Sequence, residues 1–381
     1  NRPNWLIGGY RYRIFSLPER LMTESRALMF YLSQIIAPSS TKLSLWHDGF
    51  AISRGLLQPA TTLISVLGLL GLVSGAIWSA LRFPLIGLGV LWFFVAHSLE
   101  STFIPLELVH EHRNYLASFG IQLALVTFLF YIFRSKKPAL LILCVGLAGA
   151  YFLVLQNRAS IWSDPHYHAL HEATHQEKSA IANFLVARNF YFMALNGQKE
   201  AIAPSMEYAL MAKDNDPYSI IPEMFLVYLS EFDEVNYDPA WMKAASEKIH
   251  RYPYLAPTKQ SFKDFVSCVR EEQCNVPVED ADMLVDAAFN TRNSTLLTSA
   301  GAYYLHVRNN PSKAEAAFRK AARKNVVQTR LNLINYLIHV EKQEQACNQL
   351  NVLRKNIGLG RYKKLSIHIE DIAAVEWQLK D

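Results

Sequence analysis

Long apolar segments and short polar connectors alternate through the first 156 residues, and the pattern changes after that point. Four segments have the apolar character of membrane spans, although the second is short for one. They cover residues 58–80, 83–98, 115–133 and 138–156. From residue 157 onward, helical patterns alternate with short breaks rich in Gly, Pro, Asn and Asp, without strand-like alternation. The pattern predicts an all-α protein, with a polytopic transmembrane half followed by a soluble helical half.

The first 57 residues form a region of their own. Residues 24–37 have a helical pattern of about 14 residues, which is too short to cross hydrocarbon, so we expect an interfacial or re-entrant helix ended by Pro38. Before it, arginines alternate with aromatic residues, a mixture typical of the headgroup boundary. They are Arg2, Arg11, Arg13 and Arg20, with Trp5, Tyr10, Tyr12 and Phe15. We therefore divide the chain into an interfacial region with a periplasmic loop (1–57), a transmembrane domain of four spans (58–156) and a periplasmic domain (157–381).

An internal repeat lies near the end of the chain. Tyr304 and Leu305 recur 32 residues later, and the spacing Ala314-x3-Phe318 recurs as Ala346-x3-Leu350. Paired helices of about 34 residues with such an element are typical of tetratricopeptide repeats. Weaker units cover residues 181–213 and 218–251. We expect a tetratricopeptide-like α-solenoid, with a generic helical bundle as the alternative.

Basic residues predict the topology. Arg82 lies between the first two apolar segments, and Arg134, Lys136 and Lys137 lie between the last two. By the positive-inside tendency both turns are cytoplasmic, so the remaining connectors and everything after residue 157 share the opposite side. We expect an integral protein of a bacterial inner membrane with a periplasmic C-terminal domain; in a eukaryote that side is the lumen of the endoplasmic reticulum. A net charge of +5 without a long basic stripe does not indicate a nucleic-acid partner.

Residues 100–118, here called the charged connector, read ESTFIPLELVHEHRNYLAS. Every acidic residue between positions 58 and 156 lies in this segment. Charge beside hydrocarbon is costly and is kept for loops or for function, so the segment is a functional loop or a densely charged solvated turn. Residues 42–57, here called the facing loop, are predicted on the same side. The candidate side chains are Glu100, Glu107, His110, Glu111, His112 and Arg113 in the connector, with His47 and Asp48 in the facing loop.

Two side motifs require interpretation. His171 to His175 matches H-E-x-x-H, and His166 and His168 are near, but no third ligand follows at the spacing of a known peptidase. We interpret these residues as exposed positions of the first soluble helix and assign no metal ligand, leaving a divalent metal undetermined. Cys268 and Cys274 form a small disulfide loop or remain reduced thiols. Because the chain starts with Asn, we expect it to be the C-terminal part of a longer precursor or a trimmed chain.

Together these elements resemble a known family. The run RLMTESRALMFYLSQIIAPSSTKLSLWHDGF, the charged connector, two further spans and the repeats resemble bacterial relatives of the transmembrane and tetratricopeptide-repeat protein O-mannosyltransferases, of the GT-C class. The eukaryotic loop reads roughly A-E-R-x-L-Y-L-P-S, which residues 110–118 match with Ala117 in place of Pro. The acidic motif of the first non-cytoplasmic loop, which carries the catalytic carboxylate in this class, is absent from this chain.

The resemblance implies inverting transfer of a sugar from a polyprenyl-phosphate donor to a secreted or periplasmic protein, with no certain cofactor. The repeats are then expected to recruit the protein acceptor. Cationic groups are suited to the phosphate that leaves, and carboxylates to activation of the acceptor. We assign catalysis to Glu111 and Asp48, the donor phosphate to Arg113, His110 and His112, and auxiliary roles to Glu100, His47 and Glu107.

Two other functions fit the same sequence. In the first, the membrane segments are only an anchor, and the repeats are a scaffold for protein partners. In the second, the protein is an O-antigen polymerase or ligase, which also uses Arg and His in a periplasmic loop. An acidic pair after a first transmembrane helix upstream would favour the GT-C class over both.

Overall fold

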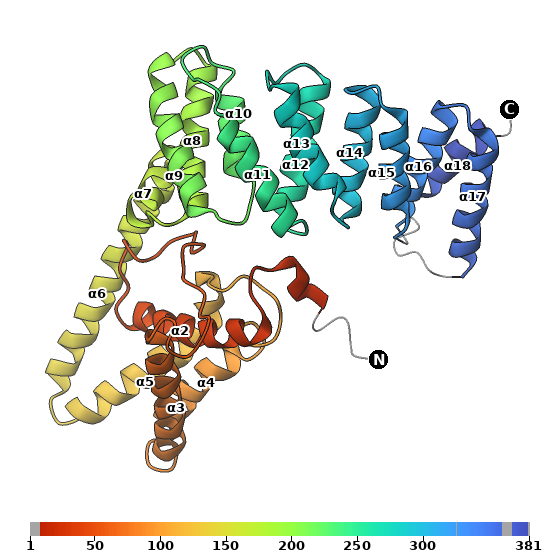
Figure 1. Ribbon diagram of the computed structural model, residues 1–381. Helices are drawn as coiled ribbons and strands as arrows, with labels where there is room; N and C mark the ends of the chain where they lie inside the picture. The colour runs from red at the N-terminus through yellow and green to blue at the C-terminus, as the bar shows by residue number, and fades with distance from the viewer. Residues whose placement is uncertain (1–7, 325, 360–367, 380–381) are drawn as a thin grey trace. The chain divides into compact units, whose positions relative to one another are not determined.

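The computed structural model describes residues 8–324, 326–359 and 368–379, and in these ranges the chain is helical without a β-strand (Figure 1). Arg2, Trp5 and Asp381 lie outside the described residues. The chain divides into two compact units, Asn1–Asn215 and Asp216–Asp381. The predicted all-α class is confirmed.

Four apolar helices dominate the first unit. They are α3 (Thr61–Ala80), α4 (Pro84–His97), α5 (Asn114–Phe133) and α6 (Lys137–Trp162). Among the described residues, α3, α6 and the continuous segment Glu111–Phe133 are long and apolar enough to cross a membrane. With 14 residues, α4 extends only about 21 Å, less than the roughly 30 Å of hydrocarbon, so a fourth span stays a prediction.

Large apolar side chains cover the outside of these helices. None of the most apolar stretch of α6 is buried within the chain, and only a small share of α3 is. Water would make such a surface unfavourable, whereas lipid would not. The backbones of α4 and α5 lie close together at Gly89 and Gly120. A Cβ at Gly89 would lie only 2.4 Å from the carbonyl oxygen of Gly120. Small residues at a crossing of this kind are typical of helix pairs in membranes.

Helix α2 (Leu17–Ile36) is longer than the sequence predicted and packs against α3 and α5 (Figure 1). It begins seven residues before position 24 because Ser16 and Glu19 form a capping box and Pro18 lies in the first turn. Arg20 is inside this helix and fully buried within the chain, and its place at the headgroup boundary stays a prediction.

The C-terminal end of α2 is held by the apolar helices. Tyr151 of α6 donates to the carbonyl oxygens of Ile35 and Ile36 at 3.1 and 3.0 Å. Gln122 of α5 donates to Ile35 at 3.0 Å. The last carbonyls of a helix have no partner within it, so these side chains supply the missing donors.

The first unit contains further helices, two short ones before or among the apolar helices and the rest after them. They are the 3-10 segment η1 (Gly8–Tyr12), the 3-10 segment η2 (Glu111–Arg113), α7 (Pro165–His175), α8 (Ala180–Leu195), η3 (Lys199–Ala201) and α9 (Ile202–Asn215). Helices α8 and α9 pack as a pair, and the turn between them contains Gly197 with φ of +92°, a conformation that favours glycine.

The second unit consists of successive helices. They are α10 (Ile221–Leu229), α11 (Pro239–Arg251), α12 (Ala256–Arg270), α13 (Val278–Phe289), α14 (Ser294–His306), α15 (Pro311–Ala322), α16 (Val327–His339), α17 (Gln343–Gly358) and α18 (Ile369–Gln378). The pairs α14–α15 and α16–α17 coincide with the 32-residue repeat, and Ala314 and Ala346 are fully buried. A Cβ at Gly301 would lie 2.9 Å from the ring of Phe318, so glycine allows that ring to approach. Repeat-like helical pairs are present, while a solenoid of tetratricopeptide type stays a prediction.

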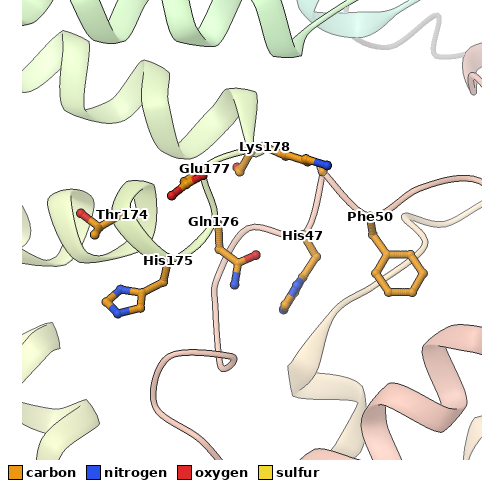
Figure 2. A pocket seen from close by; sticks show the side chains of 9 residues that line it. His47, Phe50, Thr174, His175, Gln176, Glu177 and Lys178 are labelled. Atoms are coloured by element: carbon orange, nitrogen blue, oxygen red, sulfur yellow. The ribbon is translucent and has the colours of Figure 1, made fainter.

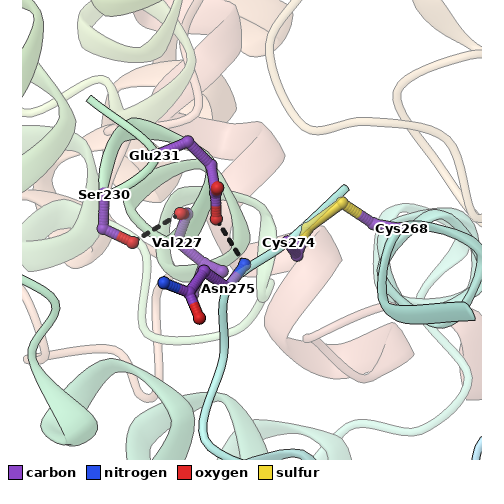
Figure 3. Close-up of a disulfide and its surroundings, with 6 residues drawn as sticks. All are labelled: Val227, Ser230, Glu231, Cys268, Cys274 and Asn275. Carbon is purple, nitrogen blue, oxygen red and sulfur yellow. Dashed lines mark hydrogen bonds between the residues drawn. A yellow bond between two sulfur atoms is a disulfide. The ribbon is translucent and has the colours of Figure 1, made fainter. Parts of the chain in front are cut away.

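Cys268 and Cys274 form a disulfide in the structure, which decides between the two states that the sequence left open (Figure 3). Their Cα atoms are 5.4 Å apart, and the bond closes a short loop at the end of α12. Next to it, the backbone N–H of Asn275 donates to Glu231 at 2.6 Å, which fixes the same loop to the end of α10.

Candidate functional site

Arg20 of α2 forms hydrogen bonds with the backbone of the charged connector. Its guanidinium donates to the carbonyl oxygens of Glu100, Thr102 and Leu106 at 2.6, 3.0 and 2.5 Å. Because this side chain is fully buried, the connector carbonyls depend on it instead of on water. The connector is therefore a fixed structure, not a loosely solvated turn.

Glu24 lies one helical turn after Arg20 and forms an ion pair with it at 2.7 Å. Burial raises the pKa of Glu24 to about 7, although the charges of Arg20 and Arg113 act in the opposite direction. A buried carboxyl of this kind binds its proton more tightly in the folded chain than in the unfolded one. Arg20 and Glu24 were not among the predicted site residues. Their i,i+4 spacing was the available signal, but the predicted helix began too late to include both.

The cationic part of the connector is only partly open to solvent. The Arg113 side chain is 4% exposed, lies 3.3 Å from Glu100 and donates to the Glu107 carbonyl oxygen at 2.8 Å. His110 contacts the carboxylate of Glu107, and its ring centroid lies 4.9 Å from that of His112. His112 is exposed. Four of the predicted connector residues are thus paired among themselves, and His112 is the imidazole that solvent reaches.

Glu111 joins the connector to the facing loop. One of its carboxylate oxygens lies 2.8 Å from Nε2 of His47 and accepts from the backbone N–H of Ser44, also at 2.8 Å. The His47 side chain is 5% exposed. Since Glu111 belongs to η2, two residues before Arg113, the structure brings a carboxylate and an imidazole together from two distant segments, close in sequence to the cationic residues of the connector.

Asp48 has a different environment. Its carboxylate accepts from the hydroxyl of Ser179 and from the backbone N–H of Ile181 at 3.1 Å. Both partners lie at the start of α8, where backbone N–H groups have no intrahelical acceptor. Asp48 therefore holds the facing loop at the N-terminus of α8.

The second residue of the H-E-x-x-H motif is not exposed, contrary to expectation. Glu172 is 2% exposed, accepts from the hydroxyl of Ser44 and, at 2.9 Å, from the backbone N–H of Leu45, and lies 3.3 Å from Arg158. It holds the facing loop from α7, on the side opposite Glu111. Nothing in the sequence pairs Glu172 with Ser44, because they are 128 positions apart.

The two histidines of the motif do not converge on a metal site. The rings of His171 and His175 are stacked with centroids 4.2 Å apart, and Nδ1 of His175 lies 2.9 Å from the carbonyl oxygen of His171. Within residues 8–324, 326–359 and 368–379, no group of three or more potential ligands is placed to hold a metal ion. Glu172 is occupied by the facing loop, so it is not available as the base of a peptidase.

Comparisons with known proteins give no family. The chain matches no protein-family model, and no curated protein and no solved structure matches it.

Proposed function

We propose that the protein transfers a sugar from a polyprenyl-phosphate donor to an acceptor hydroxyl at the charged connector. The observation that carries this proposal is the 2.8 Å contact between Glu111 and His47, next to Arg113 and His112 at the end of a membrane-length helix. A carboxylate, an imidazole and cationic groups in one place are the components of general-base catalysis with an anionic leaving group.

His47 is the proposed base. When Nε2–H donates to Glu111, Nδ1 is the proton acceptor, and it has no partner among the residues that the structure describes. The carboxylate fixes this tautomer and stabilises the imidazolium that forms, as a carboxylate does for the histidine of a serine-protease triad. Nδ1 takes the proton of the acceptor hydroxyl while the oxygen bonds to the anomeric carbon. The bond from that carbon to the phosphate oxygen breaks, and the polyprenyl phosphate leaves with the electron pair.

The leaving phosphate requires positive charge. His112 is exposed beside Arg113, whose guanidinium is held at the base of the connector by Glu100 and the Glu107 carbonyl oxygen. In this position the guanidinium of Arg113 contributes a fixed positive electrostatic potential, and His112 donates a hydrogen bond to the phosphate. Asp48 takes no part in this proposal because both of its oxygens hold the start of α8.

Substitution of the pair tests the proposal. His47→Ala and Glu111→Gln are each expected to lower the turnover number roughly 10²–10⁴-fold, because a positioned base contributes about that factor. Transfer of radiolabelled sugar from a panel of polyprenyl-phosphate hexoses, with the protein in lipid vesicles, measures it. His166→Ala and Glu207→Gln are matched controls, since both residues are exposed. Unchanged turnover in both pair variants would contradict the catalytic role, and no transfer by the unaltered protein from any donor would overturn the function.

The acceptor in this proposal is a secreted protein, recruited by the helical pairs of the second unit. The pairs α14–α15 and α16–α17 support this part, because repeated helical pairs are common protein-binding surfaces. If the protein captures a secreted partner but transfers no sugar, the scaffold function is favoured instead.

A further inference from the structure

A hollow of about 340 Å³ lies between the facing loop and the segment that joins α7 to α8 (Figure 2). Residues 174–179 form one side, and His47, Gly49 and Phe50 form the other. This volume is within the range of small-molecule sites. The hollow lies entirely within the first unit.

The two sides of the hollow are fixed to each other at one edge. A Cβ at Gly49 would lie 2.8 Å from the carbonyl oxygen of Lys178, so the two backbones touch there. Asp48 adds its contacts to Ser179 and Ile181. Because these contacts close one edge, the hollow is a preformed site whose width is set by the backbone.

Two charged residues, Glu177 and Lys178, line the hollow, and its other polar residues are His47, Thr174, His175, Gln176 and Ser179. His47, His175 and Gln176 project from the two sides toward the same space (Figure 2). An amide and a neutral imidazole each donate and accept hydrogen bonds, as a hydroxyl does. A phosphate only accepts, and the cationic side chains of the connector suit it better. Phe50 adds an aromatic ring to the lining, and the guanidinium of Arg26 lies over this ring, 4.7 Å from its centroid.

His47 connects the hollow to the proposed reaction. Its ring lines the hollow, and its Nε2 contacts Glu111, which precedes Arg113 in η2. His47 and then Glu111 therefore link a molecule in the hollow to the segment that carries Arg113. We infer that the hollow binds a pyranose ring through its hydroxyl groups, with Gln176 and His175 as the selecting side chains. This inference rests on the proposed function for its role in transfer, but sugar binding is measurable without it.

Binding of free sugars tests the inference. The probes are hexoses, N-acetylhexosamines and hexuronic acids, with inorganic phosphate for comparison, and saturation-transfer NMR of the full chain in detergent detects them. We expect one class of sugar to bind and Gln176→Ala to weaken it about tenfold, as the loss of one or two hydrogen bonds to a neutral group does. His175→Ala supplies an independent second variant. Gln198→Ala is the matched control, because Gln198 is also in a turn of the first unit but outside the hollow.

The outcomes separate this inference from the proposed function. Sugar binding that depends on Gln176, in a protein without transfer activity, would support sugar binding in the hollow and contradict the proposed transfer reaction. If no sugar binds detectably and Gln176→Ala keeps its transfer activity, sugar binding in the hollow is contradicted while the proposed transfer reaction is not. Binding of phosphate instead of sugars would also contradict sugar binding in the hollow. If transfer occurs, the KM values of Gln176→Ala show which substrate contributes the pyranose ring bound in the hollow. A raised KM for the donor indicates the donor sugar, and a raised KM for the acceptor indicates the acceptor.

Discussion

Arg20 and Glu24 are the residues on which the connector depends most directly. A guanidinium that is fully buried and paired with a buried carboxyl is costly unless its remaining donors are satisfied, and here three connector carbonyls satisfy them. Removing either partner leaves an uncompensated group inside the first unit. These two residues therefore couple the stability of the unit to the shape of the connector.

The pKa of Glu24 predicts a pH-dependent stability. Burial raises it to about 7 from 4.5, so the folded state binds the proton more tightly, and protonation stabilises it. This stabilisation is present below about pH 4.5 and is lost as the pH rises through about 7. We expect the free energy of unfolding of the unaltered protein to fall by up to about 3 kcal/mol, relative to Glu24→Gln, between about pH 5 and pH 8. Thermal and denaturant unfolding in detergent micelles measures the difference.

The comparison with Glu24→Gln is needed because histidines titrate in the same range. Gln stays neutral but still accepts from Arg20, so this variant removes the titration while keeping the contact. Parallel pH curves for the two proteins would show that the pKa of Glu24 is not raised into this range, and would contradict this prediction.

The facing loop is the element whose position decides the site. It has no regular helix over residues 42–57, yet it is held at several points by neighbouring helices. Arg26 of α2 donates to the carbonyl oxygen of Ala51 at 2.5 Å, and the backbone N–H of Ser53 donates to Thr23 at 2.8 Å. Glu172 holds the Ser44 region from α7. Because neighbouring elements fix the loop, His47 is positioned to contact Glu111 although His47 itself is not in a helix.

Glu172 gives the element-scale prediction. Glu172→Ala leaves Arg158 without its carboxylate and the backbone N–H of Leu45 without its acceptor, and we expect it to destabilise the first unit by about 3–5 kcal/mol. Faster hydrogen exchange of the amides in the Ser44 to Asp48 segment is the specific sign that the loop is released. Glu207→Ala, at an exposed position of α9, is the control. Unchanged exchange in Glu172→Ala would mean that Glu111 and Asp48 suffice to hold the loop.

At the scale of the whole molecule, the membrane side of the second unit stays a prediction. Disulfides such as the one between Cys268 and Cys274 persist in oxidising compartments and are rare in the cytosol. Helix α6 is long enough to carry the chain across a membrane, from the basic turn at Lys137 to Ser163.

Labelling tests this topology. In a chain without the free cysteines Cys144 and Cys347, a cysteine at Ser163 is expected to react with a membrane-impermeant maleimide in intact cells, and a cysteine at Lys137 only after lysis. The expected ratio of labelling before and after lysis is near one for Ser163→Cys and near zero for Lys137→Cys. The reverse pattern would place the connector in the cytoplasm and remove the basis for a secreted acceptor.

The helices were predictable from the sequence because each depends on local information. Apolar runs of spanning length predicted α3, α5 and α6, and the short second run became the 14-residue α4. The 32-residue offset predicted the pairs α14–α15 and α16–α17. The density of charge in residues 100–118 singled out the connector. Composition and periodicity determine which residues form helices and which faces avoid water.

The tertiary structure decided which polar groups meet. Glu111 contacts His47 across 64 positions and Glu172 contacts Ser44 across 128, while Asp48 reaches the start of α8 across 131. The periodicity of a sequence predicts that a side chain is buried. The hydrogen-bond partner of a buried polar group depends on which residues the fold brings within reach. The sequence by itself therefore drew attention to the connector, and only the packing of α2, the facing loop and α7 around it separated the proposed pair of Glu111 and His47 from residues that hold the loop in place.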